Sequence, residues 1–416
     1  MIGIPRSLTG IFLRIWDFSA KSLPFLSNRV QITQWHNSFC VQAEYSGLSS
    51  FVDPGAEGDS DGICKTEINK ESEGDLECRQ HIRKPKQKFA IMLAYCGKDY
   101  YGMQRNPGNA EFCTVEDHLL SALVKTGCIP ESHAWDNKWL EFQRCARTDK
   151  GVSALGQLVS LRLWNSEALS EKINFYLPPQ IRVLGINRVT CGFNSKNNCD
   201  KRTYSYTLPT ASLVPGGSAY YERSFRLPRK TFHDINHLLS FYCGTHNYHN
   251  FTQGKTAHDP SARRYLIAAH CSEPFVRDGA EFLSIQLCGQ SFMRHQIRKM
   301  VGLVLAVARG HVQEAFLHWA LGKDKIHIPK APGLGLVLEQ THFDRYNCRY
   351  GSDGIHEQIS WEDVDSDIIA FKEKMVLPFI LSGELEEDCM GHWLQTLVRH
   401  DYVQSGSAIE MSSEKE

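Results

Sequence analysis

Predicted strands and predicted helices alternate irregularly along the centre of this 416-residue chain, and this alternation constrains its fold more than any other feature. A compact apolar run at 89–95, bounded by Gly97, is typical of a buried strand. Residues 157–164 and 203–208 alternate between apolar and polar side chains, as half-buried strands do. Residues 281–287 are predicted to form a further strand.

Two further segments have the helical period. Residues 114–126 begin with Thr114 as the N-cap and Asp117 three positions on, and Gly127 ends them. A second predicted helix, 292–308, carries one apolar stripe formed by Ile297, Met300, Val301, Val304 and Leu305. Irregular alternation of both kinds of element favours an α+β fold with mixed or antiparallel sheets.

The length of the chain suits about two lobes plus tails. Basic residues outnumber acidic ones at the start, which predicts either a mitochondrial presequence or an unstructured leader. The expected divisions are the leader at 1–40, an acidic disordered linker ending in a basic stretch at 41–87, one lobe at 88–200, a second lobe at 201–350, and an acidic, helical extension with a frayed tail at 351–416. No run of about 18 apolar residues is present, so no membrane span is expected.

Charge is distributed unevenly along the chain. Residues 81–350 hold 35 Lys and Arg against 21 Asp and Glu, whereas 351–416 hold 4 against 15 and 1–80 hold 7 against 11. A basic body between acidic ends is what binding to a phosphate backbone requires. Basic residues that only solvate the surface are the alternative, and charge alone does not decide between them.

The sequence lacks the motifs of several kinds of cofactor-binding and metal-binding sites. The fourteen cysteines include no Cys-x-x-Cys pair, and the closest two, Cys191 and Cys199, are eight positions apart. We therefore expect no zinc site and a reducing compartment. The GKT at 254–256 lacks the first glycine of a phosphate loop, and 331–338 lacks the third glycine of a dinucleotide fingerprint.

The segment 144–157, RCARTDKGVSALGQ, contains one carboxylate, Asp149, among basic residues. These basic residues are Arg144, Arg147, Lys150 and, nearby, Arg105. Positive charges keep a carboxylate ionised, as a nucleophile requires. The alternative is a turn, because Asp before Lys-Gly often bonds its own backbone. Local chemistry leaves both interpretations open.

The sequence RTDKGVSALGQ resembles the catalytic motif of the TruA family of tRNA pseudouridine synthases. Three more segments resemble that family's motifs in the same order, namely AYCGKDYYGMQRN at 94–106, FNSKNNCDKRTYSY at 193–206 and QSFMRHQIRKMVG at 290–302. The likeness covers roughly residues 88–345 and is closest to the eukaryotic members. It implies two ferredoxin-like lobes, with mixed or antiparallel sheets, around a central basic cleft.

The resemblance implies roles for four residues. Asp149 matches the invariant aspartate that attacks the substrate, and Arg147 matches an arginine that enters the RNA helix and helps to evert the uridine. Tyr204 matches the tyrosine that stacks on the flipped base, and Arg298 matches the arginine that pairs with the aspartate. Without the resemblance, Tyr204 is a core tyrosine of an alternating strand and Arg298 extends to solvent.

The remaining candidates for substrate binding are also basic: Arg105, Arg144, Lys150, Arg202 and Arg264. The sequence departs from many bacterial members at Cys96, where they have Asp, and at Met103, where they have Trp. It also has Arg294 where they often have His, which is expected to alter RNA contacts. Three histidines are interpreted as structural or RNA-contacting: His246, His249 and His295.

The implied reaction breaks the bond between uracil N1 and ribose C1′ and rejoins the base through C5. The redox state is unchanged, so no cofactor is expected. The base must leave its stack at a cost of a few kcal/mol, which phosphate contacts and an aromatic platform such as Tyr204 offset. Attack by Asp149 at C1′, attack at C6 and elimination to a glycal all stay open. Asp149 is favoured over Tyr204 as the base for the C5 proton, because a phenol is a weak base near neutral pH.

The implied partner is RNA, chiefly tRNA at uridines of the anticodon stem, with messenger and spliceosomal RNA as further candidates. A monomer is favoured over the dimer of bacterial relatives, because the C-terminal extension can cover that surface. Nucleus and mitochondrion are the expected locations. The competing hypothesis is a catalytically inactive RNA-binding or chaperone protein on the same fold, which would be marked by damage at Asp149, Tyr204 or Arg298.

Overall fold

The computed structural model describes residues 86–106, 108, 111–164, 170–215 and 224–402, all within one compact unit, Gln80–Glu416. The expected leader at 1–40 and nearly all of the linker at 41–87 lie outside the described residues, as do residues 403–416 of the expected tail. In the described part of the chain, no helix combines the length and apolar character needed to cross a membrane.

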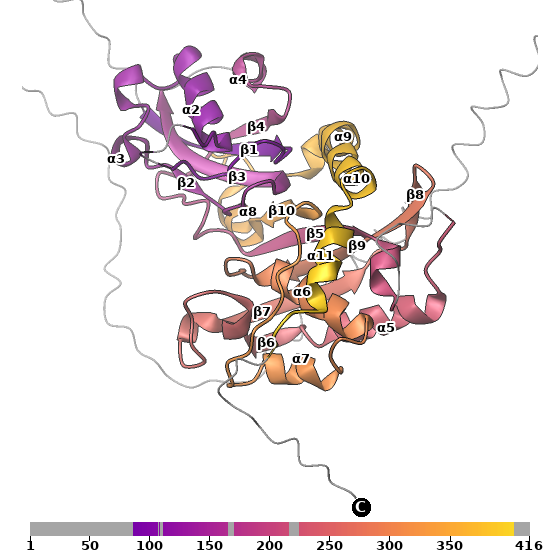
Figure 1. Cartoon of the computed structure of the whole chain (residues 1–416). Helices are drawn as coiled ribbons and strands as arrows, with labels where there is room; N and C mark the ends of the chain where they lie inside the picture. The colour runs from indigo at the N-terminus through magenta and orange to yellow at the C-terminus, as the bar shows by residue number, and fades with distance from the viewer. Residues whose placement is uncertain (1–85, 107, 109–110, 165–169, 216–223, 403–416) are drawn as a thin grey trace, which may run out of the picture. The chain divides into compact units, whose positions relative to one another are not determined.

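The described strands form one ten-stranded sheet, with a main path in the order β4-β1-β3-β10-β5-β9-β7-β6 (Figure 1). The strands are β1 (Lys86–Tyr95), β2 (Gln143–Arg144), β3 (Ser153–Trp164), β4 (Ile181–Arg188), β5 (Lys201–Pro209), β6 (Gly244–Asn247), β7 (Arg263–Cys271), β8 (Phe275–Arg277), β9 (Ala280–Gly289) and β10 (Leu336–His342). All the pairings are antiparallel except that of β10 with β3. A mixed sheet with helices confirms the predicted fold class.

Strand β10 lies in the middle of this sheet and joins its two halves. Its residues Val337 and Leu338 pair in parallel with Ser153 and Ala154 of β3. On its other side, Leu338 pairs with Tyr204 of β5 in the antiparallel sense. Strands from before residue 200 therefore lie at one end of the sheet and strands from after it at the other. The division into two ferredoxin-like lobes stays a prediction.

The helices are α2 (Val115–Lys125), α3 (Asn137–Leu140), α4 (Ser170–Tyr176), α5 (Arg229–Ser240), α6 (Gln296–Ala308), α7 (Ala315–Ala320), α8 (Asp344–Tyr350), α9 (Asp365–Phe371), α10 (Leu377–Leu385) and α11 (Cys389–Leu397). Short 3₁₀ turns connect them at Glu131–His133, Thr210–Leu213, His249–Phe251, Pro260–Ala262 and Glu362–Val364, and a π turn lies at Lys372–Val376. The predicted capping box of α2 is present, because Thr114 accepts from the backbone of Asp117, and the Asp117 side chain accepts from Thr114.

Helix α6 begins four residues later than predicted. His295 precedes it with a φ of 64°, in the left-handed region, which interrupts the helical path that the sequence suggested from residue 292. The apolar stripe itself is as predicted, because Ile297, Met300 and Val304 are buried. The late start leaves Arg294 and His295 in the approach to the helix, beside the candidate site described below.

Strand β3 was predicted to be half-buried, and this was wrong. Both of its faces are covered, since Leu158 and Val159, neighbours on opposite faces within the predicted segment 157–164, are both fully buried. Leu155 belongs to a cluster with Phe371 and Ile380 from α9 and α10. The C-terminal extension therefore covers a face of the sheet, where Figure 1 shows α9 and α10 beside β3.

Candidate active site

Asp149 lies in the short loop between β2 and β3, which is bonded to the loop that follows β1. The amide of Gly151 donates to the carbonyl of Tyr100 at 3.1 Å, and the amide of Met103 donates to the carbonyl of Thr148 at 3.4 Å. The amide of Val152 donates to the carbonyl of Asp149 at 3.1 Å, which closes a turn. The turn interpretation of this segment is therefore correct for the backbone, and the carboxylate is left for other partners.

A glycine allows the two loops to approach this closely. Gly102 has a φ of +91°, and a Cβ there would lie 2.5 Å from the carbonyl oxygen of Thr148. Any side chain at this position would both strain the backbone and push against the residue that precedes Asp149. The sequence AYCGKDYYGM thus supports the Asp149 loop by close backbone packing.

Buried side chains fix the strand residues that lead to Asp149. Gln157 of β3 accepts from the amide of Ala146 at 3.1 Å and donates to its carbonyl at 2.8 Å. Tyr95 and Thr148 share a hydrogen bond of 2.9 Å between their hydroxyls. Because all these groups are buried, the bonds are protected from water, and the loop is held in one geometry. In the sequence, Tyr95 and Gln157 look like ordinary strand residues and have no local signal of this role.

Two cationic or polar side chains face the Asp149 carboxylate. The Nη1 of Arg298 lies 3.3 Å from its Oδ2, and the Nε2 of His295 lies 3.5 Å from the same oxygen. The side chain of Asp149 is 28% exposed, against 14% for Arg298 and 8% for His295. The carboxylate is therefore open to a substrate while its two partners are largely enclosed.

A second hydrogen bond orients the side chain of Arg298. Its Nε donates to the carbonyl of Ala331 at 2.7 Å, and the amide of Ala331 donates back to the carbonyl of Arg298 at 3.1 Å. Gly333 lies against the same guanidinium, because a Cβ there would be 3.7 Å from Cζ of Arg298 and 3.6 Å from the carbonyl oxygen of Lys150. Both bonds and the low exposure argue against an arginine that only extends to solvent.

His295 is held beside the carboxylate in a strained backbone conformation. Burial is the largest influence on its pKa and lowers it, while the charge of Asp149 raises it. Lys330, Arg294 and Arg298 also lower the pKa of His295. A lowered pKa makes the neutral imidazole the dominant form near neutral pH. In that form Nε2–H can donate to Asp149, while Nδ1 is buried with no hydrogen-bond partner among the described residues.

Lys330 completes the positive surroundings and was missed in the sequence. Burial lowers its pKa most, the charges of Arg298 and Arg294 lower it further, and the charge of Asp149 raises it. Lys330 directly precedes the segment 331–338, which lacks the third glycine of a dinucleotide fingerprint. Its position next to Ala331 was the available signal, but only the Ala331–Arg298 pairing shows where it lies.

Tyr204 of β5 lies in the core, with 7% of its surface exposed. Its ring meets Phe292 edge to face, with 5.2 Å between centroids. Burial raises the pKa of Tyr204 strongly, with a smaller contribution from Tyr95, which bonds to Thr148 beside Asp149. The phenol is therefore protonated throughout the physiological range, which makes it a poor base.

Four of the basic candidates for RNA contact divide into two exposed and two partly buried residues. Arg147 is exposed and has no hydrogen bond or ion pair within the described residues, and Lys150 lies over the ring of Tyr101 at 4.0 Å. The other two are held by acids of α2. Arg144 lies 2.8 Å from Glu116, and Arg105 lies 3.2 Å from Asp117. Arg147 and Lys150 flank Asp149 and are the freest to meet a phosphate.

Neither Arg202 nor Arg264 forms an ion pair with Asp149, and the two differ in their contacts: Arg202 is bonded to backbone carbonyls, whereas Nε of Arg264 is buried without a hydrogen-bond partner among the described residues. Arg202 is 7% exposed and donates to the carbonyls of Gln290, Cys145 and Lys196. Arg264 is partly buried, and burial lowers its pKa. This placement favours a structural role for Arg202, and substrate binding by either residue stays a prediction.

Known proteins were compared with the chain. Residues 239–344 match the family model described as tRNA pseudouridine synthase. Pseudouridylate synthase 1 homolog of Mus musculus is 52% identical over 325 residues, which cover 78% of this chain and 76% of the relative. The homolog of Homo sapiens is 52% identical over 314 residues, covering 76% and 74%. tRNA pseudouridine synthase 1 of Yarrowia lipolytica is 34% identical over 389 residues, covering 73% and 72%.

Together with the mixed sheet, these matches define an RNA-modifying isomerase, and they confirm the resemblance seen in the motifs. The chain belongs to the tRNA pseudouridine synthase family, with relatives of high identity among the pseudouridylate synthase 1 homologs of mammals. The roles carried over to Asp149, Tyr204, Arg298 and Arg147 stay predictions. In the described part of the chain, no group of three or more His, Cys, Asp or Glu side chains is arranged to hold a metal ion.

Proposed function

We propose that this chain isomerises uridine to pseudouridine in tRNA with Asp149 as its nucleophile. The observation that carries the proposal is the Asp149 carboxylate, which is partly open to solvent and faces Arg298 and His295 in a chain of this family. An ionised carboxylate between two largely enclosed nitrogen donors is oriented and stays nucleophilic. The proposed reaction uses only this carboxylate and the flipped nucleotide.

The chemical step needs a base turned out of its helix. Arg147 is exposed next to Asp149, where it can enter the space that the uridine leaves. Asp149 then attacks C1′ or C6, or assists loss of the base to a glycal. In each case the N1–C1′ bond breaks, a C5–C1′ bond forms, and any bond between Asp149 and the nucleotide is broken again to release the carboxylate. Asp149 removes the C5 proton, because burial keeps the phenol of Tyr204 protonated. Arg298 orients the carboxylate through the contact between its Nη1 and Oδ2 of Asp149.

Tyr204 is proposed as the aromatic platform for the flipped base. Stacking on an aromatic ring contributes about 1–3 kcal/mol per base. Tyr204→Phe keeps the ring and should retain most turnover, whereas Tyr204→Leu should lose it. Equal loss in both variants would instead assign the chemistry to the hydroxyl.

The main test compares wild type with Asp149→Asn on tRNA transcripts, using mass spectrometry after chemical labelling of pseudouridine. Conversion by wild type alone is expected, because Asn keeps the shape and loses the nucleophile. Turnover by Asp149→Asn would overturn the proposed mechanism. Tight tRNA binding without turnover by wild type would support the competing hypothesis of a non-catalytic RNA-binding protein.

The proposed targets are uridines of the tRNA anticodon stem, with messenger and spliceosomal RNA as further substrates. The support is the basic body of the chain, which suits recognition by shape and phosphate geometry more than by base sequence. The same labelling experiment on tRNA, an isolated anticodon stem-loop and messenger transcripts ranks these substrates. Equal rates on unstructured RNA would contradict recognition of the stem.

A further inference from the structure

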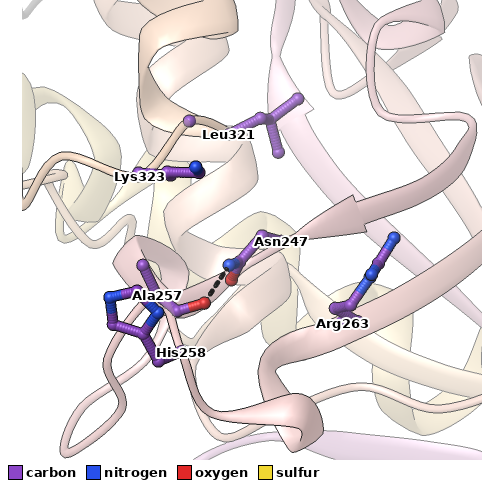
Figure 2. A pocket seen from close by; sticks show the side chains of 7 residues that line it. Asn247, Ala257, His258, Arg263, Leu321 and Lys323 are labelled. Carbon is purple, nitrogen blue, oxygen red and sulfur yellow. Dashed lines mark hydrogen bonds between the residues drawn. The ribbon is translucent and has the colours of Figure 1, made fainter.

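A pocket of about 330 Å³ lies at the β6–β7 edge of the sheet, and no residue of the proposed site lines it. Its walls come from the end of β6, the start of β7 and the segments around residues 257 and 322 (Figure 2). The lining residues are Asn247, Ala257, His258, Arg263, Leu321, Gly322 and Lys323. None of them is acidic, and three of them can carry positive charge.

No carboxylate lines this pocket. Arg263 and Lys323 are exposed and form no ion pair within the described residues. The acids nearest in sequence are already bonded elsewhere. Asp259 accepts from Lys255 at 2.6 Å, and Asp324 accepts from Trp319 at 2.8 Å. Two cations that line one pocket, with no carboxylate in its lining, form a site for an anion.

Hydrogen bonds hold the walls in place. The Nδ2 of Asn247 donates to the carbonyl of Ala257 at 2.7 Å, which is the bond drawn in Figure 2. Its Oδ1 accepts from the amide of His249 at 3.2 Å. Asp259 caps the turn before β7 by accepting from the amide of Ser261 at 2.8 Å. A preformed pocket loses little conformational entropy on binding.

The pocket is connected to the proposed active site through one loop. Asn247 and Thr252 are five residues apart, which limits their separation to about 18 Å. The Oγ1 of Thr252 donates to the carbonyl of Arg294 at 2.9 Å, next to His295. Lys299 of α6 donates to the carbonyl of Asn250 at 2.8 Å in the same loop. The wall of the pocket therefore lies within reach of the RNA that contains the reacting uridine.

We propose that the Arg263–Lys323 pocket binds a backbone phosphodiester of the substrate RNA, away from the uridine at Asp149. The fork of Arg263 and the point charge of Lys323 contact the phosphate oxygens, and His258 and Asn247 form the remaining wall. Such a contact positions the RNA and carries no base information. This inference rests on the proposed function, since it takes the substrate to be RNA.

The strand register explains why Arg263 lines the pocket and Arg264, the candidate chosen from the sequence, does not. Arg263 pairs with Asn247 across the β6–β7 ladder, and Arg264 pairs with His246. Successive side chains of a strand point to opposite faces, so only one of the two arginines can face the pocket. Arg263 lines the pocket, and Arg264 is partly buried.

The test is equilibrium binding of full-length tRNA to wild type and to Arg263→Gln/Lys323→Gln, as a function of salt. The double variant should bind about tenfold more weakly, and the slope of log affinity against log salt should fall by about one to two. The urea unfolding midpoint of the double variant should match that of wild type, which shows that the variant is folded. A matched control, Lys172→Gln/Arg188→Gln, removes two exposed charges at the β4 end of the sheet and should change affinity less than about twofold.

Wild-type affinity and salt slope in the double variant would overturn the proposal. Binding of inorganic phosphate to the wild-type pocket, observed by phosphorus NMR, together with unchanged tRNA affinity in the variant, would overturn it too, because the site would then serve a free anion. Binding needs no turnover, so the outcome is separate from that of Asp149→Asn. If wild type lacks turnover and the double variant still binds tRNA about tenfold more weakly, the pocket proposal stands and the proposed function is wrong.

Discussion

Arg298 contacts Asp149 across 149 positions of sequence, with 3.3 Å between Nη1 and Oδ2, while its Nε donates to Ala331 at 2.7 Å. One guanidinium thus joins the nucleophile loop to the segment before β10. The bond to Ala331 fixes the direction of the side chain, and Nη1 faces the carboxylate. The geometry depends on the planar fork of arginine and not on its charge alone.

Arg298→Lys tests this dependence. Lysine keeps the charge but has no Nε–H directed at Ala331, so we expect turnover of bound tRNA to fall about 100-fold. Affinity for tRNA should stay within about threefold, because no charge is lost. Single-turnover pseudouridine formation measures the turnover of bound tRNA, and a binding titration measures the affinity for tRNA. The control is Arg294→Lys, an exposed neighbour, and a similar loss of turnover there would show that the effect is not specific to the fork.

The imidazole of His295 should titrate below its ordinary value of 6.5, because burial and three nearby cations lower its pKa. The charge of Asp149 raises that pKa, so Asp149→Asn should lower the titration midpoint further. NMR of the chain with labelled histidine measures both midpoints. His295→Asn, which tolerates the positive φ, assigns the resonance by removing it. A midpoint at or above 6.5, or one that does not respond to Asp149→Asn, would contradict the geometry.

Glu384 makes stability depend on pH. It is 1% exposed in α10, and burial raises the pKa of Glu384 to about 7 from 4.5. The folded state therefore binds this proton more tightly than the unfolded state. Its contribution is fully present below pH 4.5 and is lost as pH rises to about 7, at a cost of up to about 3 kcal/mol.

Glu384→Gln should remove this cost. The variant should unfold at higher urea concentration than wild type at pH 8 and at a similar concentration near pH 5. Urea unfolding at several pH values measures the difference between the two. A difference that is the same at both pH values would show that the carboxyl does not titrate in this range.

Gly102→Ala should destabilise the fold and impair catalysis. The new methyl would lie 2.5 Å from the carbonyl of Thr148 at a φ of +91°, so we expect a loss of about 2 kcal/mol or more together with a shift of Asp149. Gly127→Ala is the matched control, since its φ is +71° and nothing lies within 4 Å of the added atom. It should cost about 1 kcal/mol and leave turnover unchanged. Equal effects in both variants would show that only backbone strain matters.

Local patterns predicted much of the fold. The apolar run that became β1, the capping box at Thr114 and the buried stripe of α6 all follow from interactions within a few residues. The late start of α6 did not follow, because a left-handed His295 is stabilised by its surroundings and has no local signal. The coverage of β3 also escaped prediction, since Phe371 and Ile380 lie more than two hundred positions away.

The sequence by itself determined the family, the position of the candidate nucleophile, four of the ten described strands and two of the ten described helices, because motifs and periodicity are local properties. Only the tertiary structure decided that His295 and Lys330 join Arg298 around Asp149, that Arg202 is enclosed by carbonyls, and that Arg263 faces a pocket while Arg264 does not. These outcomes depend on strand register and on contacts between distant segments. Such contacts form when the buried surfaces pack, and no short stretch of sequence encodes them.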